Sequence, residues 1–275
     1  MPSAVVATYN LHGGVDGWGR PFDVVAACRA VDADVLVVQE SWAPDAGAST
    51  ASRVADALGY AVTELAMARG RMLSAPPGAG SRWGPPLWAR SRYGMRLYRR
   101  GRAGATRDAR HGPGTTEVER GSWGIAVLSR LPVAGTRLID LGQLPADPAR
   151  RGAIAVDVVL AGSVPLLVVG THMAHLSQGS PRHLRALRRT LADSEERPAV
   201  LAGDMNMWGP PLSVALPGWS RAARGRSWPS WWRHPLAQSD HVLVTGSVRV
   251  ERGEVLRLPG SDHYPVRATL VVGAP

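Results

Sequence analysis

The feature that most constrains this chain is a short apolar run that ends in polar residues, at Pro198–Asn206. The run P-A-V-L-A-G has the length and character of a buried strand, and Asp204 and Asn206 follow it two residues apart. Side chains alternate along a strand, so these two point the same way where the strand ends. Such polar groups belong either to a functional site or to a plain strand-end turn, and the G-D-x-N pattern alone does not separate the two.

Other polar residues stand in the same kind of setting, because each follows or interrupts a short apolar run. They are Asn10, Glu40, His172, Asp240 and His263. Strand ends that all carry polar chemistry indicate one shared site. We therefore expect these residues to converge with Asp204 and Asn206 in one pocket at the rim of the fold.

Length and composition bound the kind of protein. The chain has 275 residues, of which 45% are hydrophobic, so it can bury one large core and nothing forces two domains. The single cysteine, Cys28, excludes an intramolecular disulfide and a zinc cluster built of cysteines. The first residues do not resemble a secretory signal, and no apolar run approaches the ~18 residues that a membrane span requires. We therefore expect a soluble, cytoplasmic protein.

The charge is strongly positive and unevenly distributed. The formal net charge is +10, and all 32 basic residues are arginine. From Arg82 to Arg120, ten arginines stand against three acidic residues, so this segment alone carries +7. Such a segment is typical of contact with phosphate groups, and it supplies the candidate substrate-binding residues Arg96, Arg99 and Arg100. The bias of a GC-rich genome produces the same composition, and the sequence leaves both interpretations open.

Most of the chain has the pattern of strands, with a few helices between them. Strands are expected at 4–9, 34–39, 60–67, 95–98, 122–129, 133–141, 152–160, 164–170, 198–203, 240–245, 247–256 and up to 272, with 240–256 as a hairpin. Helices are expected from Pro21 through Cys28, at 52–58 and at 180–191. Strands that deliver polar residues at one rim, with helices outside, predict two packed sheets flanked by helices.

Two stretches lack a regular pattern. The first is an Arg-rich excursion at about 69–121, and the second is a loop at about 208–238 that is rich in tryptophan and arginine. The tryptophans of the second stretch either pack under a long loop or form a stacking platform beside a basic groove, and the sequence does not decide between these.

Several of the polar residues fit metal-assisted chemistry. Glu40 is a natural ligand for a hard divalent cation, with Asn10 and Asp262 as further oxygen donors. Few protein ligands, with water completing the shell, favour Mg²⁺, with Mn²⁺ as a substitute. A carboxylate–carboxamide pair and a histidine paired with an acid supply groups that activate water, so the set fits hydrolysis at phosphorus. The chain has no P-loop, G-x-S-x-G or kinase motif, which argues against nucleotide-driven transfer and serine acyl chemistry.

Seven short motifs stand in the order of a known family. They are Tyr9-Asn10-Leu11-His12, Val38-Gln39-Glu40, Gly124-Ile125-Ala126-Val127-Leu128-Ser129-Arg130, Gly170-Thr171-His172, Gly203-Asp204-Met205-Asn206, Ser239-Asp240-His241-Val242-Leu243 and Ser261-Asp262-His263-Tyr264-Pro265-Val266. In this order they resemble the endonuclease/exonuclease/phosphatase family, the DNase I-like superfamily, from residue 4 to about 270. The resemblance implies one α/β domain over 1–275. Its fold would be a four-layer sandwich of two packed, mainly antiparallel β-sheets flanked by α-helices.

The resemblance also implies a metal site and phosphate contacts. By it, Glu40 binds Mg²⁺ and is assisted by Asn10 and Asp262, while His172 binds a phosphate oxygen. For His12, a phosphate contact and an ordinary loop position remain equal alternatives.

The catalytic groups are implied in the same way. Asp204 and Asn206 orient or deprotonate the attacking water and hold the phosphate. Asp240 orients His263, which contacts the scissile phosphate or acts as the base. Which of Asp204 and His263 is the base stays open.

Three functions follow from the resemblance. The first is a Mg²⁺-dependent phosphodiesterase or nuclease that acts on DNA or RNA, and the second is a hydrolase of small phosphoesters or lipid head groups. The third, an inactive member kept as a binding module, requires a broken site, and none of the expected positions is broken. His12 stands where abasic-site endonucleases carry Asp, and Met207 and Trp208 stand where inositol-phosphate phosphatases carry an aromatic residue and Arg. Neither subgroup is therefore supported, and no obligate protein partner is inferred.

Overall fold

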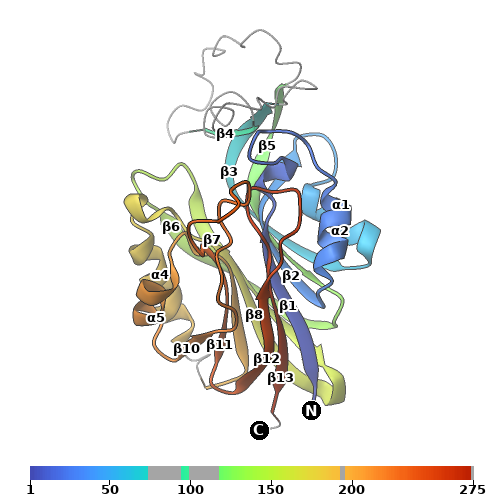
Figure 1. Cartoon of the computed structure of the whole chain (residues 1–275), viewed down its shortest axis with the longest axis vertical. Coiled ribbons are helices and arrows are strands. Elements are labelled where there is room, and N and C mark those ends of the chain that lie inside the picture. Colours follow the sequence, from blue (N-terminus) through green and yellow to red (C-terminus); the bar gives the residue numbers. More distant parts are fainter. Residues whose placement is uncertain (74–93, 99–117, 193–195, 274–275) are drawn as a thin grey trace.

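Two β-sheets packed face to face form the centre of the molecule (Figure 1). The computed structural model describes residues 1–73, 94–98, 118–192 and 196–273. The seven-stranded sheet has the order β12 (Val248–Val255), β13 (Val266–Val272), β1 (Ser3–Asn10), β2 (Val35–Pro44), β5 (Val118–Ser129), β3 (Ala61–Leu73), β4 (Gly94–Leu97). The six-stranded sheet has the order β10 (Trp219–Arg221), β11 (Asp240–Thr245), β9 (Ala199–Asp204), β8 (Val164–His172), β7 (Arg150–Leu160), β6 (Val133–Gln143).

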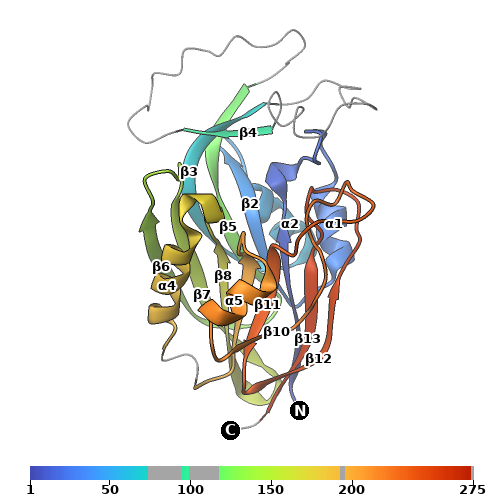
Figure 2. The same ribbon diagram turned by 60° about the vertical axis from the view of Figure 1, so that its left-hand side comes forward.

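Helices cover both outer faces and complete four layers (Figures 1 and 2). On the seven-stranded sheet lie α1 (Val24–Val31) and α2 (Thr50–Leu58), and on the six-stranded sheet lie α4 (Ser180–Thr190) and α5 (Gly209–Ala215). Short 3₁₀ turns are η1 (His12–Gly14), η2 (Ala161–Ser163) and η3 (Leu176–Gln178). The predicted four-layer α/β sandwich is confirmed. Among the described residues, no helix is long and apolar enough to cross a membrane.

The apolar strands bury both of their faces. In β2, Val35 and Val37 point into the core between the sheets, whereas Leu36 and Val38 pack beneath α1 and α2. This alternation follows from the two-residue period of a strand. Full burial of such a side chain contributes about 1.5–3 kcal/mol relative to exposure, so uninterrupted apolar runs hold three layers together.

One parallel pair stands inside each otherwise antiparallel sheet, and these pairs create the rim. Strand β1 runs parallel to β2, and β8 runs parallel to β9. The carboxyl ends of parallel strands meet at one edge, so Asn10 ends beside Gln39 and His172 ends beside Asp204. The two edges lie next to each other across the sandwich, because the Asn10 Nδ2 atom donates a hydrogen bond to Asp204 Oδ2 at 3.1 Å.

Strand β2 continues past the residue at which the sequence predicts its end. It runs to Pro44, and its pairing with β5 shifts register between Gln39 and Ser41. Glu40 occupies the irregularity with a φ of 55°, a left-handed conformation that is uncommon for a residue with a side chain. The carboxylate therefore leaves the sheet within a strand rather than after one.

Part of the expected irregular excursion is regular. Strands β3 and β5 remain paired as far as Leu73 and Val118, so they form a long ribbon that extends beyond the sandwich toward β4 (Figure 1). The strand expected at 95–98 is β4, shifted by one residue. The remainder, 74–93 and 99–117, lies outside the described residues and includes Arg99 and Arg100. The second irregular stretch likewise contains α5 and β10.

Two local predictions are wrong. The expected hairpin at 240–256 does not form, because β11 pairs with β9 and β10 while β12 pairs with β13 in the other sheet. The connection therefore carries the chain from one sheet to the other. Helix α1 begins at Val24 and not at Pro21, since the Asp23 carboxylate accepts a hydrogen bond from the Ala26 amide and caps the helix there.

Candidate active site

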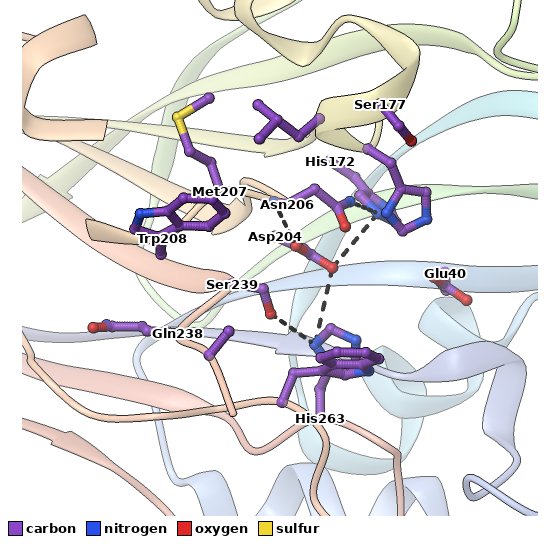
Figure 3. Close-up of a pocket in the computed structure, with 14 residues that line it drawn as sticks. Glu40, His172, Ser177, Asp204, Asn206, Met207, Trp208, Gln238, Ser239 and His263 are labelled. Carbon is purple, nitrogen blue, oxygen red and sulfur yellow. Dashed lines mark hydrogen bonds and ion pairs between the residues drawn. The ribbon is translucent and has the colours of Figure 1, made fainter. Parts of the chain in front are cut away.

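A cavity of about 770 Å³ opens where the parallel strand pairs end, and five of the expected polar residues line it (Figure 3). They are Glu40, His172, Asp204, Asn206 and His263. Asn10 and Asp240 lie directly behind this surface, bonded to Asp204 and His263 respectively. The structure thus brings together residues that are as far apart as 10 and 263 in the sequence.

Asp204 stands at the centre of the cluster because its strand approaches β8 very closely. A side chain on the preceding Gly203, which has a φ of 155°, would lie 2.0 Å from the Thr171 carbonyl oxygen. Glycine therefore permits the turn that presents Asp204. Its Oδ2 accepts from Asn10 Nδ2, and its Oδ1 accepts from the Asn206 amide at 2.8 Å.

The surroundings of Asp204 favour its protonated form. The side chain is only 2% exposed, and burial together with the nearby Asp240 carboxylate raises the pKa of Asp204 from 3.8 to about 7. The positive charge of His263 and the two hydrogen bonds oppose this rise without cancelling it. A buried carboxylate with a pKa near neutrality can take up and release a proton under ordinary conditions.

Asp240 and His263 form a buried pair. The His263 Nδ1 atom lies 2.8 Å from Asp240 Oδ2, and the Ser239 hydroxyl donates to the same oxygen at 2.9 Å. Burial opposes the charged imidazole, but the Asp240, Asp262 and Asp204 carboxylates outweigh it and raise the pKa of His263 to about 10. His263 therefore carries a positive charge at neutral pH, with Nδ1 held and Nε2 as its second donor.

His172 has the opposite electrostatic character. Its Nε2 lies 3.2 Å from Asn206 Nδ2 and 3.6 Å from Asp204 Oδ2. Burial, together with the guanidinium of Arg151, lowers the pKa of His172 well below its usual range, so the ring is neutral. The same Asn206 Nδ2 atom donates to the Met173 carbonyl at 2.9 Å, and the Asn206 backbone has a φ of 48°.

A buried ion pair that the sequence did not reveal supports His172. Arg151 is 5% exposed and pairs with Asp147 through its Nε at 2.7 Å and its Nη2 at 3.2 Å. Its Nη1 donates to the His172 carbonyl at 3.3 Å, and its guanidinium covers the Trp123 ring, which also contacts the His172 ring. The only signal for this role was a pair of arginines at the start of an apolar strand.

The oxygen donors of the site fit a hard cation. The carboxylates of Asp204, Asp240 and Asp262 gather around His263, and the partly exposed Glu40 adds a fourth at the open side. Ligand atoms of Asp204, Asp240 and His263 lie within 4.8 Å of one another. The Asp240 carboxylate already holds the His263 Nδ1 atom, so Asp204, Asp240 and His263 form an ion-paired cluster. A divalent cation beside Glu40 would add positive charge to a site in which four carboxylates lie close together.

The other expected metal ligands are engaged with neighbouring groups. Asn10 donates to Glu40 Oε1 at 3.3 Å, and its own oxygen accepts from the His12 amide at 3.0 Å. In this arrangement Asn10 aligns the Glu40 and Asp204 carboxylates and turns its oxygen away from them. The Oδ1 of Asp262 lies 3.6 Å from His12 Nδ1 and 3.9 Å from His263 Nε2.

A second cavity of about 220 Å³ adjoins the first and shares Glu40 and His172 with it. His12, Arg96 and Arg151 line it, so two of the expected substrate-binding residues lie beside the site. The corresponding predictions for Arg99 and Arg100 concern residues outside the described part of the chain. Sequence reasoning did not assign Ser239 a role, although it directly precedes Asp240.

Two sheets, helices on both outer faces and an acid–histidine site at one rim define a DNase I-like α/β sandwich. Residues 7–263 match the model of the endonuclease/exonuclease/phosphatase family, and the chain belongs to this family. A search of curated proteins gave no match.

Several solved structures share the fold. An endonuclease/exonuclease/phosphatase from Beutenbergia cavernae is 21% identical over 99% of this chain and 72% of its own, with a TM-score of 0.61. The mannosyl-6-phosphatase Bt3783 of Bacteroides thetaiotaomicron is 16% identical over 97% and 99%, with a TM-score of 0.62. TDP2 of D. rerio, complexed with a single-strand DNA product, is 13% identical over 98% and 99%, with a TM-score of 0.59. Identities this low establish the shared fold alone.

Proposed function

We propose that this protein is a Mg²⁺-dependent phosphodiesterase. One observation carries the proposal: a cationic His263 and an Asp204 carboxylate with a pKa near neutrality face the same cavity as Glu40. A phosphodiester is an anion that must be attacked by water, so its hydrolysis requires a cationic contact and a proton acceptor. The cavity offers both within one small surface, in a family of phosphoester hydrolases.

The two titrating residues take different roles. His263 keeps its proton at neutral pH, because Asp240 and its neighbours raise its pKa to about 10. It therefore binds a phosphate oxygen or protonates the leaving oxygen, and it is not the base. Asp204, with a pKa of about 7, accepts the proton of the attacking water.

The neighbouring neutral groups hold the substrate. The Asn206 side chain and the neutral His172 ring border Asp204 on its cavity side, where they orient the water and the phosphate oxygens. Glu40 would hold Mg²⁺, with Asp262 as a further expected ligand, while Asn10 positions the Glu40 carboxylate through its Nδ2 hydrogen bond. When bound there, the cation supplies positive charge that stabilises the developing charge on the phosphoryl oxygens.

The two cavities favour two classes of substrate. Arg96, from the Arg-rich segment, lines the smaller cavity next to Glu40, and this favours a nucleic acid whose next phosphate lies on that side. The larger cavity favours small phosphoesters, since it has room for a whole small ligand and several of its lining residues are apolar. Nucleic acid is the first candidate and small phosphoesters the second.

The decisive experiment compares hydrolysis of bis-p-nitrophenyl phosphate, single-stranded DNA, plasmid DNA and phospholipid with Mg²⁺ and with EDTA. Glu40→Gln should reduce Mg²⁺-dependent turnover by about a hundredfold or more, because it removes the ligand charge while keeping the size. Glu251→Gln, the same change at an exposed position on β12, is the matched control and should keep full activity. Equal activity of the two variants, or equal rates in EDTA, would refute the proposal.

A further inference from the structure

The lining of the larger cavity combines the catalytic groups with an apolar part, the apolar side, which comprises Leu176, Met207, Trp208, Trp228 and Ala237. In Figure 3, Trp208 and Glu40 lie on opposite sides of Asp204. A volume of about 770 Å³ is that of a site for a whole small ligand rather than for a phosphate group alone. The apolar side therefore has room for a further part of the substrate.

Two apolar side chains on this side remain exposed. Trp208 precedes the first turn of α5 and is 51% exposed, and Leu176 in η3 is 42% exposed. Packing does not account for Trp208, because α5 attaches to its sheet through the buried Leu212. Exposed apolar groups that converge on a pocket with polar groups mark contact with a ligand.

Trp228 is held in place next to the catalytic histidine. Its ring meets Trp231 edge to face at 6.2 Å, and Trp231 meets Trp18 at the same distance. The Trp228 ring centre lies 6.4 Å from that of His263. A planar group joined to a phosphate on His263 would therefore meet a preorganised indole.

Charge separates the two cavities. No arginine is among the described residues that line the larger cavity, whereas Arg96 and Arg151 line the smaller one. The described residues that line the larger cavity therefore offer no guanidinium to a continuing chain of phosphates. The apolar side thus suits a group without charge, and the arginine side suits an anionic one.

We propose that the wall formed by Leu176, Trp208 and Trp228 binds one ester arm of the substrate, an uncharged planar ring. This inference rests on the proposed function and narrows its substrate class. A nucleobase and an aryl ring share the required chemistry. Any further phosphate of the substrate leaves the site on the side of Arg96.

The test measures binding without turnover. Calorimetric titration of the full chain in Mg²⁺ compares phenylphosphonate with methylphosphonate, which share the anionic group and differ in the ring. Phenylphosphonate should bind about tenfold more tightly, in line with stacking of a ring on an indole. Cyclohexylphosphonate, which is apolar but not planar, should bind more weakly than phenylphosphonate. Equal binding of the phenyl and methyl compounds would overturn the proposal, and equal binding of the phenyl and cyclohexyl compounds would overturn the planar preference.

Variants locate the effect. Trp208→Ala should abolish the phenyl-to-methyl preference, and Trp208→Phe should retain most of it. Trp232→Ala is the matched control, because Trp232 is 48% exposed but does not line the cavity. Because Trp208 is half-exposed, its replacement should not unfold the protein, and thermal unfolding of the variant checks this directly. A preference that survives in Trp208→Ala, or disappears in Trp232→Ala, contradicts the proposal.

Two further ligands identify the ring and separate this inference from the proposed function. A thymidine 5′-phosphonate that binds more tightly than phenylphosphonate assigns the site to a nucleobase, and weaker binding assigns it to an aryl group. If the ring preference is found but no diester is hydrolysed, the proposed function fails and the binding site stands. If diesters are hydrolysed and the ring preference is absent, the inference alone fails.

Discussion

The Asp204→Asn substitution should stabilise the protein at alkaline pH while it abolishes turnover. Folding moves the pKa of Asp204 from 3.8 to about 7, mainly by burial and by the Asp240 carboxylate. Three pKa units at ~1.4 kcal/mol each mean that an ionised Asp204 destabilises the fold by about 4 kcal/mol. Asparagine removes the charge but turns an amide toward Asn10 Nδ2, and the lost acceptor offsets about 1–3 kcal/mol. The expected net gain is about 1–3 kcal/mol at pH 8.

The gain should depend on pH in a defined direction. The unfolded carboxyl loses its proton near pH 3.8, whereas the folded one keeps it until about pH 7. Between these values the folded state binds more protons than the unfolded state, so stability falls as pH rises. Asparagine does not titrate. From pH 4 to pH 7 the stability of the variant should therefore increase relative to that of the parent, and above pH 7 the difference in the free energy of unfolding should be constant.

Urea unfolding in EDTA at pH 4.5 and pH 8 measures both quantities. The matched control is Asp147→Asn, which changes a carboxylate that is also buried but is paired with Arg151. Removing that charge leaves a buried guanidinium unpaired and should destabilise the protein by about 3–5 kcal/mol. The reasoning would be refuted by an Asp204→Asn variant that is less stable than the parent at pH 8, or equally shifted at both pH values.

The other predictions concern single charges at the site. Asp240→Asn removes the carboxylate that most strongly raises the pKa of His263, so the alkaline limb of the rate–pH profile should move down by about 1–3 pH units; an unmoved limb would mean that protonated His263 is not required. Arg96→Gln should lessen the salt dependence of single-strand binding by about 0.7 in the log–log slope, as expected for one lost phosphate contact, and leave hydrolysis of bis-p-nitrophenyl phosphate unchanged. An unchanged slope would assign Arg96 to a solvated surface.

The convergence of the polar residues could be predicted because it depends on local patterns. Asn10, His172 and Asp204 each end a buried run, and strands of a packed sheet present such ends at a common edge. The same reasoning failed where a local pattern is compatible with two partners. Strands β11 and β12 are close enough in sequence for a hairpin. However, β11 belongs to the six-stranded sheet and β12 to the seven-stranded sheet, so their apolar side chains enter the shared core from opposite sheets. Sequence separation alone does not tell which sheet a strand joins.

The conformation of single residues could not be predicted from the sequence either, because it too depends on contacts between distant strands. Nothing local marks Glu40 as the residue that leaves β2 with a positive φ, because the surrounding strand is regular on both sides. Arg151 and Asp147 are only four residues apart in the sequence. What makes their ion pair important to the site is that Arg151 also donates to the His172 carbonyl, which belongs to another strand. Its effect on a histidine twenty-one positions away exists only in the folded state.

The chemistry of the site depends most on the neighbours of each carboxylate, which the sequence does not reveal. Asp204 and Asp240 are both aspartates that follow or begin apolar strands, and by pattern they are equivalent. Their neighbours distinguish them, since Asp240 holds the His263 nitrogen and Asp204 receives donors from Asn10 and Asn206. Burial and the Asp240 carboxylate raise the pKa of Asp204, and the nearby charge of His263 offsets this rise only in part. We therefore propose Asp204 as the base, because the His263 nitrogen is held by the Asp240 carboxylate and not by that of Asp204.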